Sequence, residues 1–222
     1  MSWDPTWEQV FRARDWGRYP PEELIRFVAR NFFRASERTQ IKILEVGCGA
    51  GANLWFLARE GFDAYGVDAS ETAIVKARRR LQEDNLSAQF QVGDIVTLTN
   101  IFPGTQFDAV IDVACLQHNR PQTIPFILDQ IWSVLKPHGR MFSMMVAHGS
   151  YGDGLGTQVE PGTWTDIREG PMHGMGLAHF STIDEIQPWF GRFVDVQVEY
   201  SERSMNNQTH SYKHWVIEAI KS

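Results

Sequence analysis

The stretch that decides the fold is Ile43-Leu44-Glu45-Val46-Gly47-Cys48-Gly49-Ala50-Gly51. Its first half is a short apolar run with β-branched residues, which predicts a buried strand that ends at Gly47. Residues 53–60 then have the apolar pattern of a helix. A strand, a glycine-rich turn and a helix in this order predict one βα unit.

The same alternation of strand and helix continues along the chain. Further strands are expected over 64–67, 88–92, 107–113 and 140–146, and further helices over 71–84 and 122–135. Strands separated by helices of this length need crossover connections, which give a parallel sheet covered on both faces. The sequence therefore predicts a single doubly wound α/β domain whose core spans residues 41–146.

Three segments lie outside this core. Residues 1–40 are predicted to be a helical cap: they hold a Trp-rich stretch and then an amphipathic helix opened by Pro20-Pro21, and we expect this helix to pack over the ligand-binding edge of the sheet. Residues 147–180 are predicted to be a lid or substrate insertion, because such a long glycine-rich stretch with little periodicity is usually functional or disordered. Residues 181–222 predict a helix and an antiparallel hairpin, so that a mainly parallel seven-stranded sheet ends in a C-terminal antiparallel strand.

Composition narrows the class of protein. The formal net charge of −6 argues against a broad surface for nucleic acid, which depends on clustered Lys and Arg. Cys48 and Cys115 lie in apolar contexts, which favours a reducing compartment. Neither an export signal nor a run of about 18 apolar residues is visible. We therefore expect a cytoplasmic monomer or homodimer without nucleic-acid or membrane partners.

Three acidic residues follow or end successive strands. Glu45 precedes the glycine-rich turn, Asp68 ends the second strand, and Asp94 follows the third. The glycines alone match the G-x-G-x-x-[G/A] pattern of a dinucleotide site, and the spacing from Gly47 to Asp68 suits a ribose contact in NAD and in S-adenosylmethionine alike. A pyrophosphate beside several carboxylates is disfavoured, whereas a cationic nucleoside tolerates them. The acidic set therefore favours S-adenosylmethionine.

The chain resembles the class I S-adenosylmethionine-dependent methyltransferases in five ordered motifs. Motif I of that family is similar to residues 43–51, and motif II to Tyr65-Gly66-Val67-Asp68-Ala69-Ser70. The resemblance continues through Gly93-Asp94-Ile95, Phe107-Asp108-Ala109-Val110 and Val134-Leu135-Lys136-Pro137-His138-Gly139-Arg140. It covers about residues 41 to 146 and implies a Rossmann-like fold and methyl transfer.

The resemblance also implies roles for single residues. Gly47 and Gly49 would let the backbone approach the methionine part of the cofactor, Asp68 would hold both ribose hydroxyls, and Asp94 and the Ile95 amide would bracket the adenine. The full set of expected cofactor contacts is Tyr19, Glu45, Gly47, Cys48, Gly49, Asp68, Ala69, Asp94, Ile95 and Val113. Tyr19 is included because Pro20-Pro21 would hold its ring rigidly and aromatic faces favour cations. For Trp3, Trp7 and Trp16 we expect hydrophobic packing of the added helix instead.

The sequence signals for the methyl acceptor and its site are less specific than those for the cofactor. Asp112-Val113-Ala114-Cys115 stands where amino-methylating DNA enzymes of this fold typically show Asp/Asn-Pro-Pro-aromatic, which favours a small-molecule acceptor. His118 is the candidate general base, with a capping role for the next helix as the alternative. His148, Tyr151 and His179 are the candidate acceptor contacts, and Cys115 is expected in the core. We expect no metal site, since no tight ligand spacing is visible.

Other functions stay open at this point. An NAD-linked oxidoreductase would explain the glycine pattern, and an inactive cofactor-binding regulatory protein would explain good motifs without a convincing base. Aminopropyl transfer, as in spermidine synthase, is disfavoured because the region of Asp112 lacks several carboxylates. A faint resemblance of residues 16–24 to bacterial enzymes suggests a natural-product or surface-carbohydrate pathway.

Overall fold

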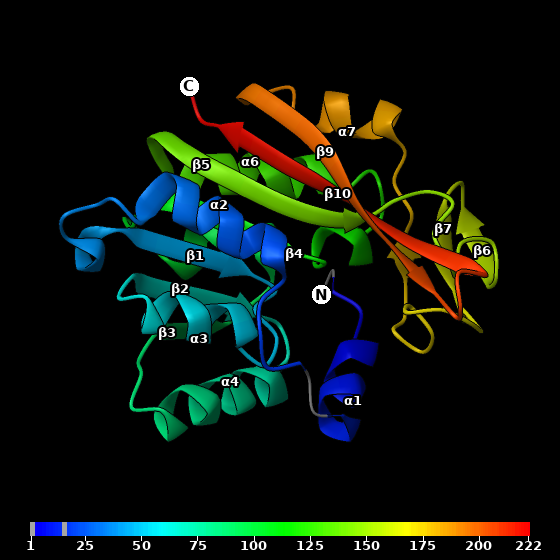
Figure 1. Cartoon of the computed structure of the whole chain (residues 1–222), viewed down its shortest axis with the longest axis horizontal. Helices are drawn as coiled ribbons and strands as arrows, with labels where there is room; N and C mark the ends of the chain where they lie inside the picture. The colour runs from blue at the N-terminus through cyan, green and yellow to red at the C-terminus, as the bar shows by residue number, and fades with distance from the viewer. Residues whose placement is uncertain (1–2, 15–16) are drawn as a thin grey trace.

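A seven-stranded sheet forms the centre of the protein, in a computed structural model that describes residues 3–14 and 17–222. The strand order is β3-β2-β1-β4-β5-β10-β9 (Figure 1). Strands β1 to β5 are parallel, and β10 is antiparallel to both of its neighbours. The strand bounds are β1 Lys42–Val46, β2 Asp63–Asp68, β3 Gln89–Val92, β4 Phe107–Val113, β5 Leu135–Val146, β9 Val194–Met205 and β10 His210–Ile220. The predicted mainly parallel sheet with a C-terminal antiparallel strand is confirmed.

Helices cover both faces of this sheet. The helix bounds are α2 Glu22–Phe32, α3 Ala52–Arg59, α4 Glu71–Glu83, α5 Leu98–Ile101, α6 Ile124–Val134 and α7 Ile183–Trp189, with single 3-10 turns η1 Arg38–Gln40, η2 Ile95–Thr97 and η3 Leu116–His118. Successive strand residues point to opposite faces. Ile43 therefore joins the apolar cluster of α2, α3 and α4, whereas Leu44 joins that of α5, α6 and α7. The result is the predicted doubly wound domain with three layers.

The N-terminal cap is divided differently from the prediction. Helix α2 carries the expected apolar stripe, but it packs on the face of the sheet, where the Phe27 ring lies 5.0 Å from the Phe142 ring. The ligand-binding edge is covered instead by α1 (Thr6–Ala13), which lies inside the Trp-rich stretch (Figure 1). The expectation that this helix covers the edge was wrong, because its wide apolar stripe is buried against the flat face of the sheet.

The insertion after β5 is folded. It contains a three-stranded antiparallel sheet made of β6 (Thr157–Glu160), β7 (Thr163–Thr165) and β8 (Ala178–His179). A small apolar cluster packs this sheet against the end of β5 and against β10; its buried members are Val146, Ile167, Met172, Ala178, Phe180 and Tyr212. The strands are too short for their alternation to be visible in the sequence, which is why the segment seemed irregular.

The C-terminal hairpin has long strands. Strand β9 continues to Met205, and β10 begins at His210. This length carries the hairpin beyond the sheet and alongside β6 and β7 (Figure 1). This extension brings Arg203 and Tyr212 to the ligand-binding edge.

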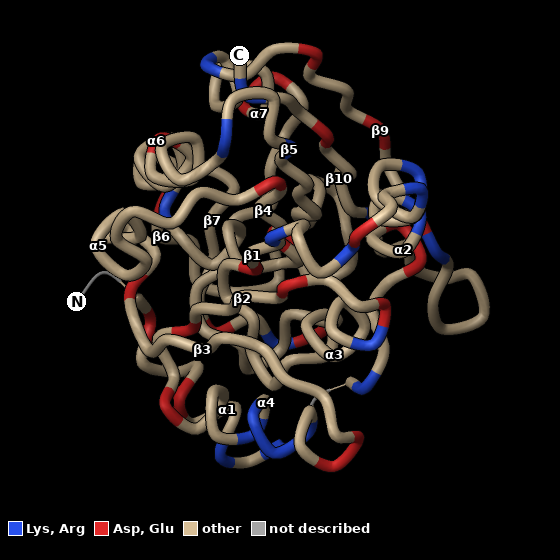
Figure 2. Tube along the Cα trace, turned by 90° about the vertical axis from the view of Figure 1, so that its left-hand side faces the viewer, with Lys and Arg blue, Asp and Glu red and all other residues tan. Residues whose placement is uncertain are grey.

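Charge is unevenly distributed over the surface. Lys and Arg residues gather on α1 and α4 at one end of the molecule (Figure 2). Two of them form ion pairs within their own helix, Arg12 with Glu8 at 3.0 Å and Arg79 with Glu83 at 3.8 Å.

Among residues 3–14 and 17–222, no helix has the length and apolarity needed to cross a membrane.

Candidate functional site

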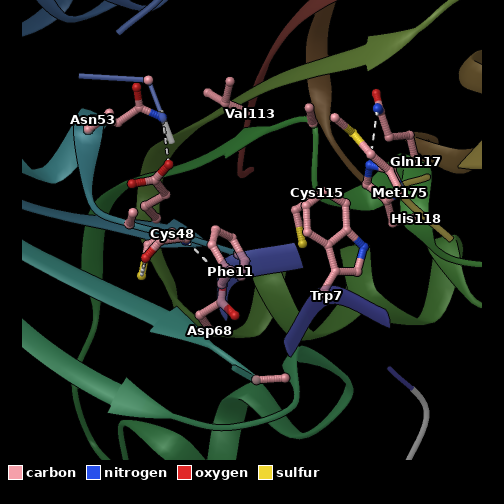
Figure 3. Close-up of a pocket in the computed structure, with 18 of the residues that line it drawn as sticks. Trp7, Phe11, Cys48, Asn53, Asp68, Val113, Cys115, Gln117, His118 and Met175 are labelled. Atoms are coloured by element: carbon pink, nitrogen blue, oxygen red, sulfur yellow. Dashed lines mark hydrogen bonds between the residues drawn. The ribbon is translucent and has the colours of Figure 1, made fainter. Parts of the chain in front are cut away.

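A cavity of about 400 Å³ opens at the carboxyl edge of the parallel strands. Ligands of open α/β sheets bind at this edge, because the strand order reverses there and leaves a crevice. The cavity runs from the glycine-rich turn after β1 to the loop after β4, and α1 lies across it (Figure 3). Residues 171–175 and the β9–β10 hairpin close its far end.

The glycine-rich turn has a backbone conformation that side chains rarely tolerate. Gly47, Gly49 and Gly51 have φ angles of +64°, +51° and +76°. A Cβ atom on Gly47 would lie 2.3 Å from the sulfur of Cys115, so the loop after β4 packs directly on this glycine. Glycine is therefore required at position 47 for both its conformation and its close contact.

Asp68 links the ends of β1 and β2. Its carboxylate accepts hydrogen bonds from the backbone N–H of Gly49 and of Ser70, each at 2.8 Å. Burial raises the pKa of Asp68, and these two hydrogen bonds act in the opposite direction. The side chain is only 8% exposed and lines the cavity. It is thus held in one orientation at the point where a ribose would lie.

Glu45 presents an unpartnered acceptor to the cavity. One carboxylate oxygen accepts a hydrogen bond from the Asn53 amide at 2.5 Å. The other oxygen, Oε2, is buried and has no hydrogen-bond partner. Burial raises the pKa of Glu45 well above its usual range. A cationic group placed at this oxygen would satisfy it and favour the ionised form of the side chain.

Helix α1 covers the cavity with aromatic rings. Trp7 and Phe11 both line it, and the edge of Trp7 meets the ring of His118 with centroids 4.6 Å apart (Figure 3). Phe11 also packs on Ala50 and Ala73, which fixes α1 on the turn after β1 and on α4. The cover is thus part of the packed structure.

His118 is held in a defined tautomer. Its Nδ1 atom lies 2.7 Å from the carbonyl oxygen of Leu177, which can only accept, so Nδ1 carries the proton. Nε2 is then the acceptor, and the Gln117 amide nitrogen donates to it over 3.4 Å, the length of a weak hydrogen bond. Burial lowers the pKa of His118 to about 4, although the Leu177 hydrogen bond and the Asp4 carboxylate act in the opposite direction. The ring is therefore neutral at physiological pH.

Gln117 connects His118 to the far end of the cavity. Its side-chain oxygen accepts a hydrogen bond from the Val146 N–H at 2.7 Å, which orients the amide group. The amide nitrogen lies 3.4 Å from the sulfur of Met172. Burial raises the pKa of Tyr212, and the hydrogen bond from Gln117 acts against this shift. Gln117, His118, Met172 and Tyr212 thus form one connected wall.

The structure brings most of the predicted residues to this cavity. All of the expected cofactor contacts and the candidate base line it: Tyr19, Glu45, Gly47, Cys48, Gly49, Asp68, Ala69, Asp94, Ile95, Val113 and His118. Tyr19 lies at the rim, with 72% of its surface exposed and its ring 5.8 Å from that of Trp55. Trp16 lies outside the described residues. A residue must line the cavity to contact a ligand there, so each of these residues meets the first condition for its predicted role.

The predicted acceptor contacts lie elsewhere. His148 is exposed and its Nδ1 is 2.8 Å from the Asp153 carboxylate. Tyr151 donates to Glu169 at 3.0 Å and stacks on His210, and His179 is fully buried with Nδ1 2.8 Å from the Thr163 hydroxyl. None of the three lines the cavity, because the insertion uses them in its own packing. The structure therefore does not support the acceptor contacts predicted for them.

Several lining residues were not assigned to the site from the sequence. Trp7 was expected only to pack, and Phe11, Gln117, Met172, Arg203 and Tyr212 were not singled out. Cys115, expected in the core, is half-buried and lines the cavity as a free thiol. Only Gln117 had a signal in the sequence, since it neighbours the candidate base.

The lining fits S-adenosylmethionine by two observations. The unpartnered oxygen of Glu45 suits a cationic ammonium group, and the fixed carboxylate of Asp68 suits a pair of hydroxyls. Asp94 and Ile95 line the neighbouring part of the cavity, where the adenine would lie. Among the described residues, no group of three or more His, Cys, Asp or Glu side chains could hold a metal ion.

Comparison with known sequences places these residues in one family. Residues 43–139 match the family model described as a methyltransferase domain. The chain is 30% identical over 136 residues to a ubiquinone biosynthesis O-methyltransferase of Coxiella burnetii, covering 59% of this chain and 56% of that protein. It is 33% identical over 108 residues to a demethylmenaquinone methyltransferase of Tropheryma whipplei, covering 48% and 42%. The chain thus spans about half the length of the curated relatives it matches.

Solved structures agree in fold. The magnesium protoporphyrin IX methyltransferase of Synechocystis PCC 6803 with bound SAM superposes with a TM-score of 0.61 at 17% identity, covering 98% of this chain and 80% of that one. TehB of Haemophilus influenzae superposes with a TM-score of 0.66 at 15% identity, covering 97% and 67%. With the motif order, the strand order and the family match in agreement, residues 43–139 form a methyltransferase domain on the fold of the class I S-adenosylmethionine-dependent methyltransferases.

Proposed function

We propose that this protein transfers a methyl group from S-adenosylmethionine to a small organic acceptor. The observation that carries the proposal is the single cavity that joins the motif I turn to the wall of Gln117, His118 and Met172. A donor held at Glu45 and Asp68 and an acceptor held at this wall would share one enclosed space. Such an arrangement promotes transfer chiefly by holding the reacting atoms at near-attack distance.

The residues of the cofactor end would hold the methyl donor. Asp68 and Glu45 would bind and orient it, and Gly47 and Gly49 would allow its close approach. When bound, S-adenosylmethionine supplies a methyl group on a positively charged sulfur, which a nucleophile displaces in line. Trp7 and Phe11 exclude water from the cavity, which strengthens the electrostatic contacts inside it.

His118 would hold the nucleophile of the acceptor. Its Nε2 atom accepts only a weak hydrogen bond, from the Gln117 amide at 3.4 Å, and a hydroxyl or an amine of the acceptor would take the place of that amide. A ring with a pKa near 4 is a weak base, so its main contribution would be orientation, with the proton accepted as the bond to carbon forms. The names of the relatives, O-methyltransferases of ubiquinone biosynthesis, favour a hydroxyl as the nucleophile.

Only a short part of the insertion is placed where a lid could act, although all of residues 147–180 were predicted to form one. Of residues 147–180, only Pro171, Met172 and Met175 line the cavity. Gly170 and Gly176 flank them and Gly174 lies among them, and glycine can adopt a wider range of backbone conformations than other residues. We propose that residues 170–177 close over the acceptor while the three-stranded sheet serves as their rigid support.

Calorimetry and a methyl-transfer screen together test the proposed function. We expect S-adenosylmethionine and S-adenosylhomocysteine to bind, and S-adenosylhomocysteine to form when phenols, catechols and hydroxylated natural products of the kind found in bacterial secondary metabolism or surface carbohydrates are added. Binding of NAD without binding of S-adenosylmethionine would favour the oxidoreductase hypothesis. Binding without turnover on any acceptor would favour an inactive regulatory protein.

A further inference from the structure

The far end of the cavity carries a cation that is separate from the acidic residues of the cofactor end. Arg203 is exposed on β9, lines the cavity, and forms no ion pair with any residue among 3–14 and 17–222. The other charged residues of the lining are all acidic: Asp4, Glu45, Asp68 and Asp94. Arg203 is therefore the one cation in the described lining of a protein with a formal net charge of −6.

The register of the hairpin sets Arg203 beside Tyr212. The two residues are directly paired across β9 and β10, so their side chains stand on the same face of the hairpin. The guanidinium carbon lies 5.7 Å from the centre of the Tyr212 ring, a distance at which the ring steadies the cation. Tyr212 is 4% exposed and packed in the core of the insertion. A buried partner therefore positions an exposed side chain.

A neutral donor lies next to this cation. It is the Tyr212 hydroxyl, whose pKa the Gln117 side chain lowers, and the Val146 N–H orients that side chain at 2.7 Å. The Tyr212 hydroxyl can then direct its own proton into the cavity, and it donates to no other residue that the structure describes. The guanidinium of Arg203 and the phenol of Tyr212 together form a surface of hydrogen-bond donors, which is complementary to an anion.

The same chain of contacts leads back to the candidate base. Gln117 lies 3.4 Å from Nε2 of His118, so the donor surface begins beside the place where the nucleophile would lie. Between the donor surface and His118 the wall of the cavity is apolar, since Met172, Met175 and Trp7 line it. These side chains suit a flat ring, because methionine sulfur and aromatic edges pack well on π-systems.

From this arrangement we infer that Arg203 binds a carboxylate of the methyl acceptor, and that the acceptor is an aromatic acid whose nucleophilic group points to His118. A single guanidinium that pairs with no carboxylate in the described part of the chain balances the one negative charge of an acceptor carboxylate and matches its two oxygens. A phosphate would bring a second negative charge into a cavity that already holds four carboxylates. The inference rests on the proposed function and specifies its substrate class.

The first test compares acids with their neutral esters. Protocatechuate, gallate and anthranilate are each offered beside their methyl esters, and both turnover and binding in the presence of S-adenosylhomocysteine are measured. We expect at least one acid to bind with an affinity about 10- to 100-fold higher than that of its ester, as loss of a charge-assisted contact implies. Equal binding of acid and ester throughout the panel, or binding of no acid, would overturn the inference.

Variants of Arg203 test the residue itself. Arg203→Gln should raise KM for the preferred acid about 10- to 100-fold and leave KM for its ester and kcat little changed. Arg203→Glu should shift the preference toward a cationic catechol such as dopamine. Arg34→Gln, which removes the same charge from an exposed site outside the cavity, serves as the control and should behave as the unchanged protein. If Arg203→Gln keeps the preference for the acid, Arg203 does not bind the carboxylate.

The outcomes also separate this inference from the proposed function. Affinity for S-adenosylmethionine should be the same in Arg203→Gln and in the unchanged protein, because Arg203 lies at the other end of the cavity from Glu45 and Asp68. Turnover of neutral acceptors only would support methyl transfer and overturn the anionic substrate class. Failure to bind S-adenosylmethionine in every variant would instead remove the proposed function.

Discussion

The two ends of the cavity are built in different ways. Apart from Tyr19 at its rim, the cofactor end consists of turns that follow strand ends, and Glu45, Asp68 and Asp94 each lie within a few positions of one. The acceptor end combines α1, the loop after β4, residues 171–175 and the β9–β10 hairpin. The first is a local property of the chain, and the second depends on segments that are distant in sequence and meet only in the folded protein.

This difference separates what a substitution should do at each end. At the cofactor end, backbone conformation and close packing leave little freedom, so small changes should abolish binding. At the acceptor end, exposed or separately supported side chains should tune affinity without changing the fold. Substitutions at both ends of the cavity test that division.

Gly47→Ala should have the largest effect. The added Cβ would lie 2.3 Å from the Cys115 sulfur, and an alanine at a φ of +64° is itself strained. We expect affinity for S-adenosylmethionine to fall more than about 100-fold, or more than about 3 kcal/mol, as measured by calorimetry.

A matched control separates the strain from the collision. Gly61 also has a positive φ, +86°, but a Cβ atom there would meet nothing within 4 Å. Gly61→Ala should therefore destabilise the fold by roughly 1 to 2 kcal/mol and leave cofactor affinity unchanged. The same loss of affinity in both variants would show that the cofactor end is not sensitive to packing at Gly47.

Asp68→Asn should have the next largest effect. An amide cannot accept from both the Gly49 and the Ser70 N–H groups while offering charged oxygens to a ribose. We expect affinity for S-adenosylmethionine to fall about 10- to 100-fold.

The same strand offers the control for this variant. Asp63 begins β2 at the opposite edge of the sheet, where it accepts a hydrogen bond from Tyr65 at 3.1 Å. Asp63→Asn should leave cofactor affinity as it is. If Asp68→Asn binds S-adenosylmethionine as tightly as Asp63→Asn does, Asp68 does not hold the ribose.

These contrasts show how far the sequence alone can lead. The sheet, its helices and the cofactor end were predictable because apolar periodicity and the glycine-rich turn are local signals, and Glu45, Asp68 and Asp94 are each placed by the strand before them. The role of α1 was missed because the sequence pattern of residues 3–19 shows tryptophans but not the surface that they cover. Arg203 was missed because only the hairpin register, which pairs it with Tyr212, brings it to the cavity.

His148, Tyr151 and His179 illustrate the opposite error. Each has chemistry suited to an acceptor and lies in a glycine-rich insertion, but the insertion folds on a core of its own. Its strands have only two to four residues, which is too few for an alternating pattern to predict that core from the sequence. Residues that would have been ligand contacts in an open loop are therefore used for packing.

The pH dependence of stability should report on the buried acceptor end. His118 has a pKa of about 4 when folded and about 6.5 when unfolded. Between these values the unfolded chain takes up a proton that the folded protein does not, so stability is lost as the pH falls from about 6.5 toward 4. We expect His118→Gln to escape this loss, which amounts to about 1 to 2 kcal/mol between pH 6.5 and 5.

Other groups titrate in the same range, so the measured quantity is a difference. Burial raises the pKa of Asp112 to about 6, which makes the folded protein gain stability on acidification, and burial lowers the pKa of His214 to about 4. Both contributions are common to His118→Gln and the unchanged protein and cancel when urea unfolding of the two is compared. A gap in unfolding free energy that stays constant from pH 7 to about 5 would show that His118 is not held neutral by burial.

The smallest effect is expected at Asp4, which ties the N-terminal cap to the lid turn. One of its carboxylate oxygens accepts from the Thr6 N–H at 2.9 Å at the start of α1, and the other accepts from the Leu177 N–H at 3.0 Å. Asp4→Ser should retain an acceptor for Thr6 and lose the contact with Leu177, whereas Asp4→Ala loses both. A net hydrogen bond of about 1 kcal/mol predicts a rise of about 3- to 10-fold in acceptor KM for either variant. Affinity for S-adenosylmethionine should not change, and hydrogen exchange of residues 171–177 should become faster. Because Asp4→Ser keeps the α1 contact, an effect seen only in Asp4→Ala would locate the contribution in the helix rather than in closure of the lid.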